Sequence, residues 1–201
     1  LPFDYEARHI SRSPGFLAHT DASGGTASVR DVMPRARKSL PKFLSRVQIK
    51  ALLGVTVSVH HRMLIQLALG TGLRREELAT FPLAYVFNPD RAGHTERNIR
   101  VSLDPRDGSG MKTKGGKARD IYISRRLMTE LHHYAAHHRG KRAQGQIRAA
   151  LLLNQRGEPF ATDGKGLEQI VRSLGKQVGL RVWPHMLRHT YATHTLMALQ
   201  C

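Results

Sequence analysis

Apolar residues recur along most of the chain at the three- and four-residue spacing that is typical of helices. The clearest case is the stripe formed by Met63, Leu64, Leu67 and Ala68, which would face a core. Polar capping residues before such runs, and Gly or Pro residues after them, set the limits of the other helices. The sequence predicts helices over residues 45–53, 57–69, 75–79, 125–138, 162–178 and from 185 toward the end.

The pattern changes between residues 84 and 123, where short β-favouring runs alternate with clusters of Asn, Asp, Gly and Pro. We expect strands over residues 84–87, 99–103 and 121–123, and a hairpin in which residues 111–114 pair with 119–123 across the Gly115-Gly116 turn. A basic loop over residues 140–149 would follow the next helix. The expected fold is α+β, mainly α, with a small antiparallel β-sheet inserted after the second helix.

Residues 1–39 keep no helical or strand period for long, and Pro and Gly residues punctuate them. We therefore divide the chain into an irregular arm or linker, residues 1–39, and one compact domain, residues 40–201. No apolar run is long enough to cross a bilayer. The chain starts without Met and stops inside an apolar, helix-prone run that no Gly or Pro closes. This pattern predicts a fragment of a longer protein.

Charge narrows the class of partner. Lys and Arg number 32 and Asp and Glu 15, which gives a formal net charge of +17. Such a basic chain favours a polyanionic partner, most often nucleic acid. An anionic membrane surface is the alternative, but it calls for a basic amphipathic helix, for which the sequence has no strong candidate. The single cysteine, Cys201, excludes a disulfide framework and a cysteine zinc site, and it fits a reducing cytoplasm.

Two clusters of cations lie beside glycines. In the first, the Gly72 turn can present Arg74 at the mouth of the core, where Glu77 can hold its guanidinium. In the second, a glycine turn carries four cations, so that a lysine at its tip can reach a phosphate. Taken alone, each has a plainer explanation, which is helix capping for the first and a generic basic turn for the second. The four cations of the second cluster are Lys112, Lys114, Lys117 and Arg119.

A third cluster lies at the start of the last predicted helix. His185 and Arg188 are three residues apart and share a helix face, and His189 follows His185 by four. A guanidinium makes two-pronged contacts with phosphate oxygens, and an imidazole beside it can donate a hydrogen bond or shuttle a proton. A partly buried polar helix face is the plainer alternative.

Four further histidines include a pair, His133 and His137, at the spacing of metal ligands on a helix. No carboxylate or cysteine accompanies them at a usable spacing, so we expect a solvated helix face and no metal. The three cationic clusters together indicate a phosphodiester site that works by fixed positive charge. Its acids are too scattered to hold Mg²⁺, so neither metal nor cofactor is expected.

The three clusters resemble, in order, the motifs of the tyrosine recombinases, the phage integrase family. The matching parts are Thr71-Gly72-Leu73-Arg74 with Glu77-Leu78, the Lys-Gly-Gly-Lys-x-Arg turn, and His185-x-x-Arg188-His189-Thr190-Tyr191. The resemblance covers roughly residues 40–201 and implies a helical catalytic domain.

Roles for single residues follow from this resemblance. Arg74 and Arg188 would grip the scissile phosphate, and His185 would assist proton transfer and phosphate binding. Lys114 would be the general acid, with Lys112 and Lys117 as alternatives. Glu77 and His189 would support these groups. Contacts to DNA are expected from Lys112, Lys117, Arg119, Arg75, Lys141 and Arg142.

The resemblance also implies a reaction, which is DNA strand cleavage and rejoining through a 3′-phosphotyrosyl intermediate, without metal or ATP. Its setting would be site-specific recombination or integration for a mobile element, by four protomers on double-stranded DNA at the cytoplasmic nucleoid. The alternatives are a non-catalytic recombinase-like DNA-binding protein and a type IB topoisomerase.

One departure from the family concerns the nucleophile. The family places its nucleophilic tyrosine beyond the helix that starts with the His185 motif, and this sequence stops too soon after Arg188 to include it. Tyr191 lies where the family has a packed aromatic residue. We therefore expect no nucleophile in this chain, and residues 1–39 would be the tail of a missing N-terminal DNA-binding domain.

Overall fold

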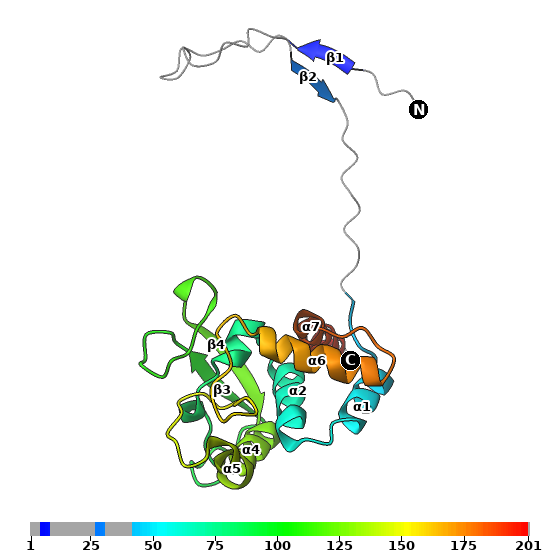
Figure 1. Ribbon diagram of the computed structural model, residues 1–201. Helices are drawn as coiled ribbons and strands as arrows, with labels where there is room; N and C mark the ends of the chain where they lie inside the picture. The colour runs from blue at the N-terminus through cyan, green and yellow to red at the C-terminus, as the bar shows by residue number, and fades with distance from the viewer. Residues whose placement is uncertain (1–4, 9–26, 31–41, 201) are drawn as a thin grey trace. The chain divides into compact units, whose positions relative to one another are not determined.

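The computed structural model describes residues 5–8, 27–30 and 42–200. It divides into two compact units, Leu1–Leu40 and Pro41–Cys201. In the first unit, strand β1 (Tyr5–Arg8) pairs antiparallel with strand β2 (Ala27–Arg30) (Figure 1). The expectation of an irregular arm over residues 1–39 did not include these strands, and the rest of that arm lies outside the described residues.

The second unit is built mainly from helices around α2. This helix contacts α3, α4, α7 and strand β4, while α6 contacts α3 and α7 (Figure 1). The capping box predicted for the first helix is present, since Ser45 and Gln48 exchange side-chain-to-backbone hydrogen bonds of 3.3 and 2.8 Å. The helices are α1 (Arg46–Gly54), α2 (Val59–Thr71), α3 (Arg75–Ala79), α4 (Arg125–Tyr134), α5 (Gly140–Ala143), α6 (Lys165–Gln177) and α7 (Pro184–Leu199).

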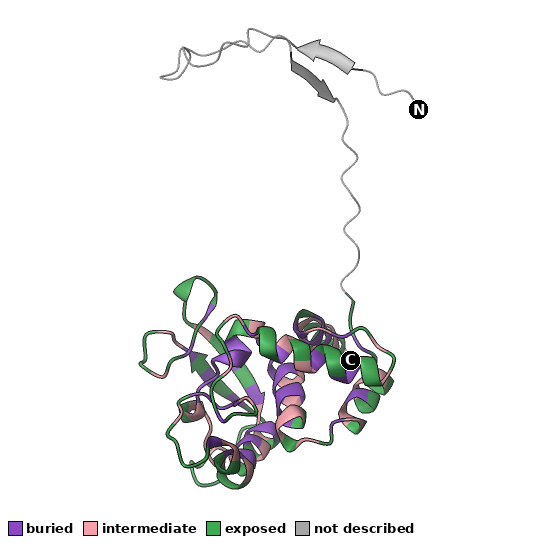
Figure 2. Ribbon diagram, in the orientation of Figure 1, coloured by how far each residue is buried: buried purple, intermediate pink, exposed green. Residues whose placement is uncertain are grey.

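A two-stranded antiparallel sheet lies against the helices. Strands β3 (Asn98–Leu103) and β4 (Arg119–Ser124) pair with Val101 opposite Ile121. Their residues alternate between exposed and buried, so one face of the sheet joins the core with α2 and α4 (Figure 2). The predicted fold class, mainly α with a small antiparallel sheet after the second helix, is confirmed, with the short α3 between them.

The strand predicted at residues 84–87 is wrong. The segment forms a 3₁₀ turn, η1 (Leu83–Tyr85), because its backbone bonds close locally: the Val86 amide donates to the Leu83 carbonyl over 3.0 Å. Directly before this turn, Pro82 forms an isolated antiparallel β-bridge with Ala150. The β-favouring composition therefore gave way to a turn.

The predicted hairpin between residues 111–114 and 119–123 is also wrong. The partner of β4 is β3, in which the buried Ile99 and Val101 lie opposite the buried Ile123 and Ile121 of β4. Residues 114–116 form a 3₁₀ turn, η2 (Lys114–Gly116), in which Gly115 takes a φ of 71°. The Lys112 amide donates to the side chain of Thr80 instead of a strand.

The helix that Ser124 caps does not end at Gly140. After Tyr134 the chain continues through a π-helical turn, η3 (Ala135–Arg139), into α5, and it stops only where Gln144 takes a φ of 50°. The basic loop predicted over residues 140–149 therefore begins as helix. The buried Arg139 guanidinium, which donates to the carbonyls of residues 148, 150 and 151, holds the returning chain against this turn.

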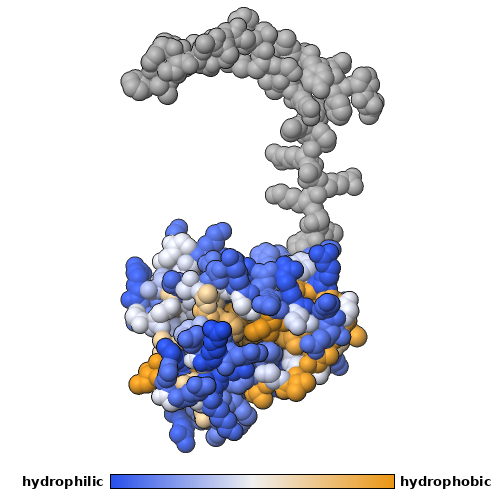
Figure 3. Space-filling view, viewed as in Figure 1, coloured by the Kyte–Doolittle hydropathy of each residue, from blue (hydrophilic) through white to orange (hydrophobic). Residues whose placement is uncertain are grey.

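Hydrophilic side chains cover most of the face shown in Figure 3, with apolar ones gathered toward α1. Val47 on α1 and Val57 between α1 and α2 are 76% and 96% exposed. Among the described residues, no helix is both long enough and apolar enough to cross a membrane.

At Gly72, the end of α2 packs against α7. It ends α2 in the left-handed conformation, with φ 61° and ψ 29°. A Cβ at this position would lie 2.4 Å from Cδ1 of Tyr191, whose ring fills the space. The turn therefore requires glycine for two reasons, which are its left-handed backbone conformation and its close contact with Tyr191 of α7.

The Gly72→Ala variant should lose about 2–4 kcal/mol of unfolding free energy, from left-handed strain and overpacking together. Urea unfolding measures this loss. Gly54→Ala is the matched control, because Gly54 ends α1 with nothing within 4 Å of a built Cβ. We expect it to change stability by less than about 1 kcal/mol. Equal losses in the two variants would contradict the role given to the Gly72 turn.

Candidate active site

A cavity of about 500 Å³ opens where the α2–α3 turn, η2 and the starts of α6 and α7 meet. It brings together all four residues predicted to be catalytic, from segments that are far apart in the sequence. The lining residues are Leu73, Arg74, Arg75, Glu76, Lys114, Glu168, Trp183, Pro184, His185 and Arg188.

Glu77 does not line the cavity, but it binds Arg74, which does. The side chain of Glu77 is fully buried. Its carboxylate accepts the Arg74 backbone amide over 2.8 Å and the Arg74 Nη1 over 2.9 Å. Arg119 donates to the same carboxylate through Nε at 3.1 Å and Nη2 at 2.5 Å. Burial alone would raise the pKa of Glu77, but the hydrogen bonds from Arg119 and Arg74 outweigh it and leave the pKa lowered. The carboxylate therefore stays ionised and fixes both guanidinium groups.

Arg188 reaches the cavity from α7, where it donates a hydrogen bond to the Gly72 carbonyl. Its pKa is lowered by burial first and then by the positive charges of Arg74 and Arg119. Arg74 and Arg188 thus both face the cavity, and among the described residues Arg188 has no carboxylate partner of its own, since Glu77 is bonded to Arg74 and Arg119 and Glu168 to Arg75. Such an arrangement favours an anion, because a bound negative charge relieves their mutual repulsion.

His185 lies in the first turn of α7, directly after Pro184 at the position that suits proline in a helix. Its ring makes an edge-to-face contact with the ring of His189, with centroids 4.4 Å apart. Burial lowers the pKa of His185 below 6.5, and His189, Arg188 and Arg74 lower it further. The imidazole is therefore neutral at pH 7, and it can donate one hydrogen bond and accept another.

The His189→Gln variant should raise the pKa of His185, because it removes the second of the causes that lower it. An NMR titration of the imidazole Cε1–H signals measures the change. His133→Gln, at an exposed position of α4, is the control and should leave the His185 titration unchanged. An unchanged His185 titration in His189→Gln would contradict the coupling of the two rings.

The residues predicted to contact DNA lie in different surroundings. Arg75 lines the cavity but forms an ion pair with Glu168. Lys112 and Lys117 flank η2, but neither lines the cavity, and Arg119 is bound to Glu77.

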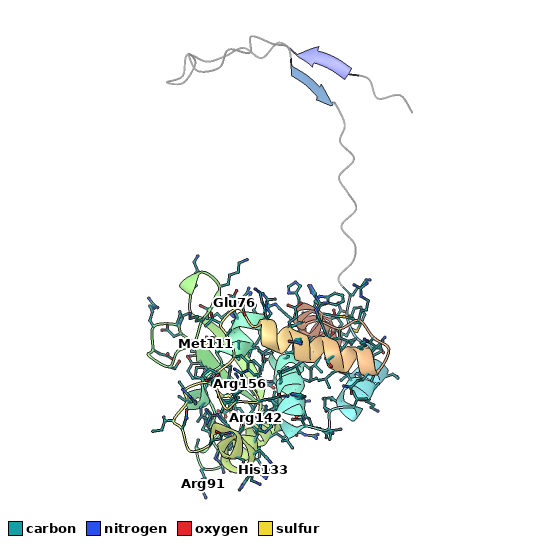
Figure 4. The ribbon with its side chains drawn as sticks, viewed as in Figure 1. Glu76, Arg91, Met111, His133, Arg142 and Arg156 are labelled. Atoms are coloured by element: carbon teal, nitrogen blue, oxygen red, sulfur yellow. The ribbon has the colours of Figure 1, made fainter. Side chains whose placement is uncertain are left out.

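Lys141 and Arg142 lie on α5, away from this site. Arg142 lines a separate cavity of about 510 Å³ together with His61 and Arg156. In Figure 4, Arg142 and Arg156 lie apart from Glu76, which lines the first cavity.

Sequence reasoning missed three features of the site. Trp183 lines the cavity, and its only sequence signal is its place directly before the Pro184 that opens α7. Glu168 gave no local signal, because its partner Arg75 lies 93 residues away. The Gly72 carbonyl, which holds Arg188, is a backbone group and leaves no side-chain signal.

None of the lining residues is a tyrosine. Tyr191 packs on Gly72, and the buried Tyr134 shares a 2.9 Å hydrogen bond with His60. Tyr85 is bonded to Asp107, and Tyr122 lies exposed on β4. Among the described residues there is also no group of three or more His, Cys, Asp or Glu side chains that could hold a metal ion.

Comparison with known proteins identifies the family. The sequence model of the phage integrase family matches residues 42–198. Tyrosine recombinase XerA of Pyrococcus horikoshii is 31% identical over 163 residues, which cover 81% of this chain and 50% of that protein. Tyrosine recombinase XerD of Halalkalibacterium halodurans is 29% identical over 188 residues, covering 90% of this chain and 57% of that protein. The chain thus spans about half the length of these relatives.

Solved structures show the same fold. The crystal structure of XerA recombinase matches with a TM-score of 0.57 at 22% identity, covering 82% of this chain and 52% of that one. The pre-cleavage complex of XerH site-specific recombinase with its difH substrate matches with a TM-score of 0.58 at 18% identity, covering 90% and 50%. The chain belongs to the phage integrase family of tyrosine recombinases.

Proposed function

We propose that this chain is the phosphate-binding part of a site-specific recombinase that cleaves and rejoins double-stranded DNA through a 3′-phosphotyrosyl intermediate. The observation that carries the proposal is the cavity in which Arg74, Lys114, His185 and Arg188 converge. Fixed donors of this kind stabilise the charge that develops on a phosphate during transfer.

The proposed reaction proceeds by two transesterifications. A tyrosine oxygen forms a bond to phosphorus while the bond from phosphorus to the 5′ oxygen breaks, and a 5′-hydroxyl later reverses the exchange. Arg74 and Arg188 hold the non-bridging oxygens, Lys114 protonates the leaving 5′ oxygen, and the neutral His185 donates a hydrogen bond or moves the proton of the nucleophile. The nucleophile comes from outside the residues that line the cavity.

The relatives support this proposal by their names and their bound partners. They are named tyrosine recombinases, and solved neighbours include recombinases in complex with DNA substrates. One is the Tn1549 transposon integrase with transposon right end DNA, at 25% identity and a TM-score of 0.56, covering 82% of this chain and 56% of that one. We extend this to a complex of four protomers on two DNA sites, acting at the nucleoid on behalf of a mobile element.

The test is a nicked suicide duplex incubated with this chain, resolved on a native gel and on a denaturing gel. We expect a shifted complex on the native gel and no covalent adduct on the denaturing gel, because the cavity is complete but has no tyrosine. The logarithm of the binding constant should fall with the logarithm of salt concentration by about 0.9 per phosphate neutralised. A salt-independent complex would contradict DNA as the partner, and a covalent adduct would contradict the assignment of the nucleophile.

A further inference from the structure

The segment that carries Lys114, residues 112–119, is here called the lysine turn. At its tip, Gly115 and Gly116 both take a positive φ, and a Cβ added at either position would have no other atom within 4 Å, so no side chain of these two residues anchors the tip. The turn also carries four cations that Arg74 and Arg188 repel. The position of Lys114 in the cavity therefore depends on contacts made by the two limbs of the turn.

One limb is bonded to the short helix α3 and the other to Thr80, the residue that caps its C-terminal end. On the incoming limb, the Lys112 amide donates to Oγ1 of Thr80 over 3.0 Å. On the outgoing limb, Arg119 makes its two hydrogen bonds to Glu77. Within the turn, Oγ1 of Thr113 donates to the Lys117 carbonyl over 2.7 Å, which joins the limbs to each other.

The helix α3 also carries the first arginine of the cavity. Arg74 caps it, and the Glu77 carboxylate that holds Arg119 holds Arg74 as well. Thr80, at the other end of α3, is 8% exposed, and its hydroxyl donates to the Glu76 carbonyl while accepting from Lys112. The helix α3 and its two capping residues thus hold both Arg74 and the turn that carries Lys114.

We propose that Arg119 and Thr80 are positioning residues that dock the lysine turn on α3 and so align Lys114 with Arg74. This gives Arg119 a different role from a DNA phosphate contact. The role of Lys114 as the acid rests on the proposed function, whereas the docking itself does not. The two parts are therefore tested separately.

The docking is tested on this chain by amide hydrogen exchange. Thr80→Val keeps the shape of the side chain and removes the acceptor, so the Lys112 amide should exchange about tenfold faster, the effect of losing one hydrogen bond. Thr129→Val is the matched control, because the Thr129 hydroxyl likewise donates to a carbonyl four residues earlier, at 3.0 Å, on α4. It should leave Lys112 unchanged. An unchanged Lys112 amide in Thr80→Val would overturn the docking.

The role of Arg119 is tested by the salt dependence of duplex binding. A phosphate contact would lower the salt slope by about 0.9 when Arg119 becomes Gln. We expect the slope to stay unchanged, while amides of the lysine turn exchange faster than in Arg100→Gln. Arg100 is a matched arginine of the same sheet, 68% exposed on β3. A lower slope with unchanged exchange would overturn the positioning role.

The consequence for Lys114 is tested in the recombinase that carries this chain. Arg119→Gln and Thr80→Val should slow cleavage of a normal duplex by at least about tenfold, part of what a general acid contributes. A duplex with sulfur at the bridging 5′ position should restore both variants to the wild-type rate, because a thiolate leaves without a proton. Failure of sulfur to restore them would overturn the link to Lys114. If the wild type forms no covalent complex, the proposed function fails, and the exchange result still decides the docking.

Discussion

Replacing Arg188 by alanine should slow the proposed strand cleavage by at least about a hundredfold and leave duplex binding nearly unchanged. The guanidinium is held by the Gly72 carbonyl on one side, which leaves its other N–H groups for the phosphate. Duplex affinity is spread over many phosphate contacts, so the loss of one changes it little. The rate depends on charge placed at the reacting phosphate, so the same loss changes it greatly.

Single-turnover cleavage of the suicide duplex and a binding titration at one salt concentration measure the two effects. The cleavage rate of Arg188→Lys should lie between those of Arg188→Ala and wild type, because lysine keeps the charge and loses the two-pronged geometry. Arg126→Ala is the control, since Arg126 is 91% exposed on α4 and pairs with Glu130 one turn further along the same helix. If cleavage and affinity fall by the same factor in Arg188→Ala, Arg188 is a binding residue and not a catalytic one.

The parts of this site that the sequence predicted are those set by local geometry. His185 and Arg188 share a face because they are three residues apart on a helix, and any helix that starts at Pro184 places them so. Arg74 and Glu77 are likewise three apart, and they meet at the start of α3. Short-range spacing is preserved whatever the rest of the chain does.

The parts that the sequence did not predict are long-range. Arg119 reaches Glu77 across 42 residues, and Arg75 reaches Glu168 across 93. Such pairs depend on which strand lies beside which helix, and the pairing of β4 was itself predicted wrongly. Once β4 pairs with β3, the buried alternation of the sheet orients Arg119 toward α3, and no pattern within residues 111–123 contains that information.

Local sequence alone groups Arg119 with the expected DNA contacts. A cation in a basic turn resembles a phosphate ligand as long as its only known neighbours are other cations. The structure supplies the buried carboxylate that the local sequence does not. Charge composition alone therefore favours a polyanionic partner, whereas the fold is needed to show which of the cations are paired with a buried acid.

The scaffold role of Glu77 predicts a second large effect. Glu77→Gln should lower the unfolding free energy by about 3 kcal/mol at pH 7, because a neutral amide leaves two arginines without their counter-charge. Both arginines are partly exposed, at 38% and 29% of their side chains, which keeps the loss toward the low end for a buried ion pair. Glu76→Gln is the matched control on the same helix, since Glu76 is exposed, and it should cost less than about 0.5 kcal/mol.

The pH dependence of the stability difference between wild type and Glu77→Gln separates the effect of charge from the effect of packing. The pKa of Glu77 is lowered in the folded chain from its ordinary value of 4.5, so its ionised form stabilises the fold fully above pH 4.5. As the pH falls through the folded pKa, the carboxylate takes up a proton and that stabilisation is lost. Urea unfolding of wild type and Glu77→Gln should therefore show a constant difference from pH 7 down to about pH 5 and a shrinking one below it. A difference that stays the same at every pH would mean that Glu77 acts by its shape and not by its charge.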